Sequence, residues 1–337
     1  MRWNARLWKN EGEGRISVKR ILVTGGTGQI GYDMTLALRK KYGGDNVVCG
    51  IHRRNPPAEI SESGPCEVVD CTDISSIRGA VDKYGVGTIY HLAAMLSAIS
   101  EADPKKAWSV NFGGLYNALE VARELSCSLF FPSSMATFGP ETPKDNTPQD
   151  TIQRPTTIYG VAKVAGELMC NYYFKKYGVD TRGVRYPGVI SSKSMPGGGT
   201  TDYSTEIFYA ALTQRRYVCY LRPDTMMPML YMPDAIKAAI TLMEAEPSKL
   251  VHRNGYNVTA MSFTPQELAE GIKKRIPGFE IEYDVDPVRQ AIADSWPNSL
   301  DDSCARKEWG WTPDYDLETM VDDIIKCLSE RLSQGGS

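Results

Sequence analysis

The amino-terminal half of the chain alternates short apolar runs with longer segments whose apolar residues recur every three to four positions. The short runs predict β-strands and the longer segments predict amphipathic helices. Their alternation predicts a parallel sheet with helices on both faces. The predicted strands are residues 21–24, 46–51, 67–69, 88–92, 128–132 and 181–186, and the predicted helices are residues 30–41, 75–84, 105–125 and 158–177.

This alternation becomes irregular after Pro187. A glycine-rich stretch at residues 195–202 predicts a mobile loop. Helices are expected near residues 203–213, 233–244, 264–275 and 317–332, with a strand near 280–283 and no clean period over 284–297. We therefore predict a tail (residues 1–17), a Rossmann-like doubly wound cofactor domain (18–186) and a smaller α/β substrate lobe (187–333). The lobe can return strands or helices to the first domain.

A glycine-rich turn follows the first predicted strand and opens the first predicted helix. Gly26, Gly28 and Gly31 fit the pattern G-x-G-x-x-G. Glycines at this spacing allow a tight turn, backbone approach to a pyrophosphate and close packing of helix on strand. The N–H groups of the following helix then face the phosphates with the positive end of its dipole. This context favours a dinucleotide site over a turn without a ligand.

Composition narrows the class of protein. The chain has 337 residues and a formal net charge of -3, which argues against a general nucleic-acid binder. No apolar run reaches the roughly 18 residues of a membrane span. The eight cysteines form no C-x-x-C pair and the three histidines are isolated in sequence. We therefore expect no His/Cys metal site, and redox chemistry would require an organic cofactor.

The first ten residues carry Arg2, Arg6 and Lys9 and no acidic residue. On a helix these three cations share one side, which is similar to a very short mitochondrial presequence. An arbitrary tail is an equal alternative. We expect a mitochondrial location, with a cytoplasmic one as the alternative.

Tyr159 and Lys163 are spaced i and i+4 on one predicted helix, which places a phenol beside an ammonium. A phenol has a pKa of about 10. A nearby cation favours the phenolate and lowers that pKa. Such a tyrosine can remove an alcohol proton while a hydride leaves the same carbon.

With Gly25–Gly31, His91–Ala94 and Asn111, this pair resembles the extended short-chain dehydrogenase/reductase superfamily from Lys19 onward. The resemblance implies that Tyr159 is the base and that Lys163 lowers its pKa and holds the nicotinamide ribose. It also implies that Asn111 supports a water relay.

A serine of the Ser133-Ser134 pair belongs to the same set. The resemblance assigns Ser134 the hydrogen bond to the substrate oxygen, and Ser133 is the alternative.

The resemblance further implies NAD as the cofactor. NAD-binding proteins carry an acid about 20 residues beyond the fingerprint that bonds the ribose. Here Ile51-His52-Arg53-Arg54 holds no carboxylate, so NADP stays open. The expected cofactor-binding residues are Gly25, Thr27, Gly28, Gln29, Ile30, Gly31, Arg53, Asp70, Cys71, Leu92, Ala93, Ala94, Tyr159, Lys163, Tyr186 and Ile190.

Segments outside the shared core, at residues 185–191, 199–203, 229–235, 253–258 and 296–301, resemble the epimerase-like L-threonine 3-dehydrogenases. That family oxidises the β-carbon of L-threonine to give 2-amino-3-oxobutanoate. A nucleotide-sugar epimerase or dehydratase of the same superfamily is the alternative. The resemblance also implies a homodimer formed through residues 105–125 and 158–177.

The bound amino acid brings a carboxylate and an ammonium that need partners. Lys144 is the expected partner of the carboxylate, and Arg154 and Arg185 are its rivals. The expected substrate residues are Ser97, Ser134, Lys144, Tyr159, Gly199, Thr200 and Trp296.

Overall fold

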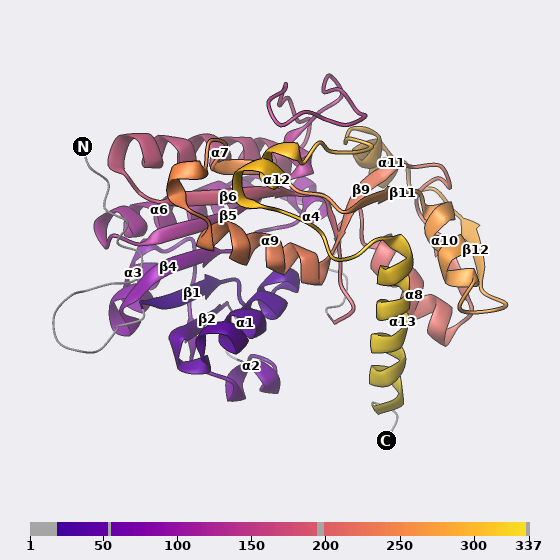
Figure 1. The fold of residues 1–337 in the computed structure, drawn as a ribbon, viewed down its shortest axis with the longest axis horizontal. Helices are drawn as coiled ribbons and strands as arrows, with labels where there is room; N and C mark the ends of the chain where they lie inside the picture. Colours follow the sequence, from indigo (N-terminus) through magenta and orange to yellow (C-terminus); the bar gives the residue numbers. More distant parts are fainter. Residues whose placement is uncertain (1–18, 53–54, 194–198, 335–337) are drawn as a thin grey trace.

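A computed structural model describes residues 19–52, 55–193 and 199–334. Its centre is a parallel seven-stranded sheet in the order β3-β2-β1-β4-β5-β6-β10, which confirms the predicted Rossmann-like fold (Figure 1). The strands are β1 (Arg20–Thr24), β2 (Val47–Ile51), β3 (Cys66–Val68), β4 (Val86–His91), β5 (Ser128–Ser134), β6 (Thr181–Tyr186) and β10 (Asn254–Asn257).

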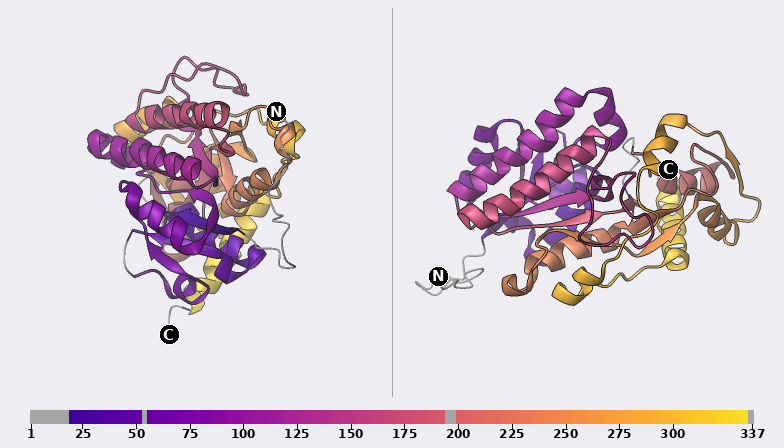
Figure 2. Two further views of the ribbon diagram at one scale, coloured as in Figure 1. Left: turned by 90° about the vertical axis from the view of Figure 1, so that its left-hand side faces the viewer. Right: turned by 90° about the horizontal axis from the view of Figure 1, so that it is seen from above.

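Helices cover both faces of this sheet (Figure 2). On β1, Leu22 packs against α3, α6 and α7, while Ile21 and Val23 point the other way, toward α1 and α9. The period of two along the strand therefore produces two apolar layers. The helices are α1 (Gln29–Tyr42), α2 (Ala58–Glu62), α3 (Ile74–Tyr84), α4 (Ser97–Ala102), α5 (Pro104–Trp108), α6 (Gly114–Glu124), α7 (Ile158–Tyr177) and α9 (Met232–Glu244).

The helix that carries the Tyr-Lys pair has clear signals at both ends. The Thr157 side chain accepts a hydrogen bond from the Gly160 N–H, and Gly178 ends the helix in the left-handed region. Its bounds match the prediction. By contrast, the single helix expected over residues 105–125 is α5 and α6 joined by a π-helical segment, Ser109–Gly113.

The remaining elements form the smaller lobe, to the right in Figure 1. It contains a three-stranded sheet (β11-β9-β7) and a two-stranded sheet (β12-β8). Its elements are β7 (Gly188–Ile190), α8 (Tyr203–Thr213), β8 (Arg216–Cys219), β9 (Met227–Tyr231), β11 (Met261–Phe263), α10 (Pro265–Lys273), β12 (Glu280–Tyr283), α11 (Pro287–Asp294) and α13 (Leu317–Gln334). Helix α12 (Ser303–Trp309) instead lies over the main sheet.

Three elements beyond Pro187 return to the larger domain, since β10 extends the main sheet, α9 covers one of its faces and α12 contacts β10. Helix α11 lies where the sequence showed no clean period. Half of the predicted loop at residues 195–202, namely residues 195–198, lies outside the described residues. Among the helices of the described ranges, none combines the length and apolar character needed to cross a membrane.

Candidate active site

One pocket opens at the carboxyl ends of β1, β4, β5 and β6, where the lobe meets the main sheet. Parallel sheets of this kind bind ligands at that edge. Its walls bring together residues from both predicted sites: Gln29, Ile30, Leu92, Ala94, Leu96, Ser97, Pro132, Ser133, Ser134, Met135, Tyr159, Lys163, Tyr186, Pro187, Gly188, Val189, Gly199, Thr200, Thr201, Asp202 and Trp296.

The glycine-rich turn has the geometry that a dinucleotide requires. Gly25 adopts φ +66°, which favours glycine. A Cβ on Gly31 would lie 2.0 Å from the carbonyl oxygen of Gly25, so no side chain fits there. No side chain of the described residues caps the start of α1 at Gly28, and its first turn holds no acid. The free N–H groups therefore fit a pyrophosphate.

Four other expected cofactor-binding residues differ in their burial and contacts. Asp70 accepts hydrogen bonds from the Thr72 N–H (2.8 Å) and hydroxyl (2.7 Å), which hold the pKa of its carboxyl below the usual value. Cys71 is buried beneath α6, and Ile190 is buried and does not line the pocket. Arg53 lies outside the described residues.

Tyr159, Ser134 and Lys163 meet in the pocket. The Lys163 ammonium donates to the Pro132 carbonyl oxygen at 2.6 Å and lies 5.5 Å from the centre of the Tyr159 ring. Burial lowers the pKa of Lys163 to about 8. Burial also raises the pKa of Tyr159 to about 12, although a hydrogen bond with Ser134 opposes that shift. The sequence predicted a lowered pKa, but in this structure desolvation of the phenol outweighs the hydrogen bond with Ser134.

A buried charge network lies behind this site, and sequence reasoning missed its central residue, Glu167. Arg185 contacts both carboxylate oxygens of Glu167 at 2.9 and 2.8 Å. The hydroxyl of Ser133 donates to the same carboxylate at 2.5 Å. Ser133 is thereby committed to Glu167, which leaves Ser134 to contact Tyr159. The available signal was the spacing, since Glu167 follows Lys163 by one helical turn.

The three cations expected to bind a substrate carboxylate do not line the pocket. Lys144 donates to the backbone oxygen of Asp294. Arg154 pairs with Glu141 on the surface, and Arg185 is held in the buried network. Among the described residues of the pocket wall, Lys163 is the one cation.

The pocket wall offers hydroxyl and backbone groups instead of these cations. Ser97, Gly199, Thr200 and Trp296 line the pocket as expected. The Thr200 hydroxyl is buried and has no hydrogen-bond partner among the described residues. A buried hydroxyl without a partner is costly, so this one is suited to a ligand.

Asn111 lies in the π-helical segment and does not line the pocket. Its side chain accepts from the Met95 N–H at 2.7 Å and donates to the Met95 carbonyl at 3.1 Å. It therefore fixes the loop that leads from β4 to Ser97. Its expected role in a water relay stays a prediction.

Comparison with known proteins shows which family has this sequence and fold. The model of the NAD dependent epimerase/dehydratase family matches residues 21–258. An uncharacterized epimerase/dehydratase of Staphylococcus haemolyticus is 52% identical over 314 residues, covering 93% of this chain and 99% of the relative.

Among solved structures, L-threonine dehydrogenase from Clostridium difficile is 54% identical, with a TM-score of 0.91, over 93% of this chain and 98% of that one. The GalE-like L-threonine dehydrogenase from Cupriavidus necator is 47% identical, with a TM-score of 0.89, over 92% and 99%. The cofactor is therefore NAD.

These comparisons overturn one prediction. A mitochondrial location is wrong, because the curated relatives come from Staphylococcus, and bacteria have no mitochondria. The ten residues that suggested a presequence lie outside the described part of the chain.

Proposed function

The chain belongs to the NAD-dependent epimerase/dehydratase family, and we propose that it oxidises the β-hydroxyl of L-threonine to give 2-amino-3-oxobutanoate. The observation that carries this proposal is the meeting of Ser134, Tyr159 and Lys163 with the glycine-rich turn in one pocket. The likeness to solved L-threonine dehydrogenases over most of the chain supports the same substrate.

In the proposed reaction Tyr159 removes the proton of the β-hydroxyl as the β-carbon becomes a carbonyl carbon. NAD, when bound, accepts the hydride that leaves this carbon. Ser134 hydrogen-bonds the substrate oxygen, and the Lys163 ammonium supplies positive charge beside the phenolate. Because burial raises the pKa of Tyr159 to about 12, the base depends on both neighbours for its ionised form.

Substrate recognition rests on the lobe and on the loop after β4. The Thr200 hydroxyl, which has no partner among the described residues, is proposed to bind the amino-acid head group together with Ser97 and the backbone at Gly199. Trp296, 5% exposed, walls the pocket on the same side.

A homodimer is part of the same proposal. Helices α6 and α7 lie side by side (Figure 2), and α7 exposes Val161, Leu168 and Tyr172 along one face. Leu168 is 63% exposed. A second copy that packs on this face would bury these side chains. We expect Leu168→Glu to convert a dimer to a monomer in light scattering; a monomeric unsubstituted protein would contradict the dimer.

The experiment that tests the activity follows reduced nicotinamide by absorbance with L-threonine and either NAD or NADP. We expect reduction with L-threonine and NAD, and little with NADP or L-serine. UDP-glucose serves as the control for the nucleotide-sugar alternative. Conversion of UDP-glucose to another sugar nucleotide, without nicotinamide reduction by L-threonine, would overturn the proposal.

A further inference from the structure

Three potential metal ligands meet outside the active site, on the side where α12 packs against the start of β10. We propose that His252, Cys304 and Glu308 bind a thiophilic divalent cation such as Zn²⁺. Cys304 and Glu308 lie one turn apart on α12, and His252 lies just before β10. One ligand atom from each of the three lies within 4.8 Å of the other two.

This separation is close to what a single ion requires. Zinc binds imidazole nitrogen and carboxylate oxygen at about 2.0–2.2 Å and thiolate sulfur at about 2.3 Å, usually in a tetrahedron. Its ligand atoms therefore lie roughly 3.5 Å apart. An ion would therefore draw the three groups closer by up to about 1 Å. They combine the soft and borderline donors that select zinc over calcium or magnesium.

Hydrogen bonds already orient the carboxylate and the imidazole. One Glu308 oxygen lies 2.5 Å from Nδ1 of His252, and the other accepts from the Val251 N–H at 2.6 Å, the His252 N–H at 3.2 Å and the Tyr256 hydroxyl. Nε2 of His252 faces a carboxylate oxygen of Asp150 at 3.2 Å. Asp150 therefore contacts the ring nitrogen opposite to Glu308 and orients the imidazole, and water would complete the tetrahedron around an ion.

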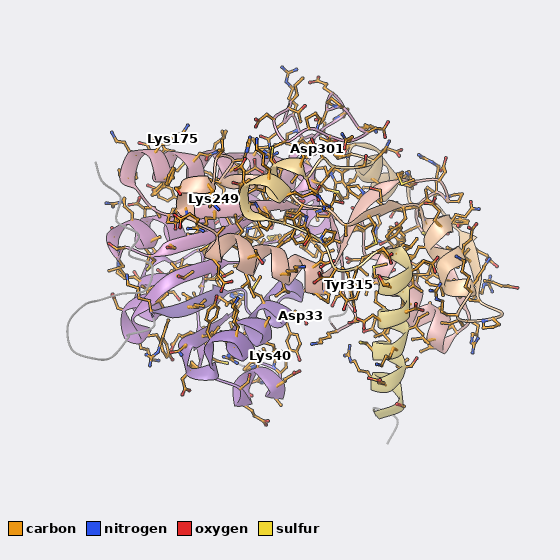
Figure 3. All side chains as sticks on the ribbon, in the orientation of Figure 1. Asp33, Lys40, Lys175, Lys249, Asp301 and Tyr315 are labelled. Atoms are coloured by element: carbon orange, nitrogen blue, oxygen red, sulfur yellow. The ribbon has the colours of Figure 1, made fainter. Side chains whose placement is uncertain are left out.

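The local charge also favours a cation. Burial raises the pKa of the Cys304 thiol, and the carboxylates of Glu308, Asp301 and Asp150 raise it further. Asp301 is labelled beside α12 in Figure 3. A bound divalent ion would neutralise these carboxylates and stabilise the thiolate. The His252 side chain is 21% exposed and Cys304 is partly exposed, so an ion can reach both from solvent.

Such an ion would join two segments that are far apart in the sequence, the residues just before β10 and α12. Since the folded chain offers the ligands together and the unfolded chain does not, binding stabilises the fold. The expectation of no metal site rested on isolated histidines, and only folding brings His252 to residues of α12.

The test uses the full chain, treated with a chelator, and Zn²⁺ or Co²⁺ as probes. We expect one ion per chain in equilibrium dialysis, a rise in the unfolding temperature and, with Co²⁺, the charge-transfer absorption of a cobalt–thiolate bond. Cys304→Ser should abolish that absorption and weaken Zn²⁺ binding at least about tenfold.

Cys327→Ser is the matched control, since Cys327 is also partly exposed and lies on another helix, α13. It should leave binding and spectrum unchanged. Absence of the thiolate absorption in the unsubstituted protein would overturn the proposal without any variant. Unchanged Zn²⁺ affinity in a folded Cys304→Ser protein would overturn it as well.

Discussion

The two ends of the active-site pocket differ in the groups that form them, which are main-chain groups at the cofactor end and side chains at the reacting end. At the cofactor end, the main chain does the binding: the turn at Gly25 and Gly31 excludes side chains and presents N–H groups. At the reacting end, Lys163 of α7 lines the pocket, and Glu167 of α7 and Arg185 of β6 form the buried charge network behind it. A main-chain site needs only local sequence, whereas each buried charge needs a partner from elsewhere in the fold.

The largest effect is expected from Tyr159→Phe, which removes the base and leaves the cofactor end intact. General base catalysis contributes about 10²- to 10⁴-fold, so kcat with L-threonine should fall by that factor. NAD binding, followed by titration of the protein's fluorescence, should change less than about threefold, because the N–H groups at the turn are untouched. Equal losses of binding and turnover would mean that the two ends do not act separately.

Glu167→Gln removes a charge from the buried network that lies behind the reacting end. The side chains of Glu167 and Arg185 are 5% and 8% exposed, so the variant leaves a buried guanidinium without its counter-charge. We expect the free energy of unfolding to fall by about 3–5 kcal/mol in urea titrations. Glu167 also raises the pKa of Lys163, so its loss should lower that pKa and shift the pH profile of kcat.

Two further variants make the result specific. Glu141→Gln breaks the exposed pair with Arg154 and should leave the unfolding midpoint unchanged. Replacing Glu167 and Arg185 together with Gln should recover part of the lost stability, since no charge is then buried alone. A pH profile of kcat that is the same in Glu167→Gln and the unsubstituted protein would restrict the network to a structural role.

The same contrast explains how much the sequence could predict. Alternating apolar runs located the six strands of the main sheet that lie before Pro187, and helix α7 was predicted to the residue. The glycine-rich turn could be predicted equally well, because its need for glycine is steric and depends only on neighbouring residues. The strand β10 was not predicted, since a four-residue strand after α9 carries no signal for the sheet it joins.

The partners of charged groups were harder to predict. Lys144 was the expected partner of the substrate carboxylate, with Arg154 and Arg185 as rivals, because sequence shows a charge and not its counter-ion. Folding commits Arg185 to Glu167, and it leaves the Thr200 hydroxyl in the pocket wall without a hydrogen-bond partner among the described residues. Pairing between residues far apart in the sequence determines which polar groups remain available to a ligand, and it leaves no short-range pattern in the sequence.

Gly31→Ala tests the cofactor end in the same way. The added Cβ would lie 2.0 Å from the Gly25 carbonyl oxygen, and its nearest neighbours are backbone atoms of Gly25 and Gly26, which cannot rotate away as a side chain could. We expect a loss of about 1–3 kcal/mol in unfolding free energy and weaker NAD binding. Gly79→Ala is the matched control, because a Cβ there meets nothing within 4 Å and alanine favours the helix α3 by about 0.5–1 kcal/mol. Unimpaired NAD binding by Gly31→Ala would remove the turn from the cofactor site.

The smallest effect concerns His91, which connects the two ends. Its Nδ1 lies 3.0 Å from the Thr24 hydroxyl at the end of β1, below the glycine-rich turn. Burial, assisted by the charge of Lys163, lowers its pKa to about 3. In the unfolded chain a histidine titrates near pH 6.5, so between these values the unfolded state alone binds the proton. Stability must then fall as the pH drops below about 6.5, by at most about 1.4 kcal/mol per pH unit, and His91 adds no pH dependence above it.

His91→Gln removes this titration and keeps a polar side chain near Thr24. Urea unfolding at about pH 8, 6 and 5 should therefore compare the free energies of unfolding of the two proteins. Relative to its value at pH 8, the difference should shift in favour of the variant at pH 6 and further at pH 5. Because the charge of Lys163 contributes to the low pKa, neutralising it in a Lys163→Met background should reduce that shift. If the free energy of unfolding changed with pH in the same way in both proteins, His91 would not be held neutral. The charge of Lys163 at the reacting end would then not lower the pKa of His91.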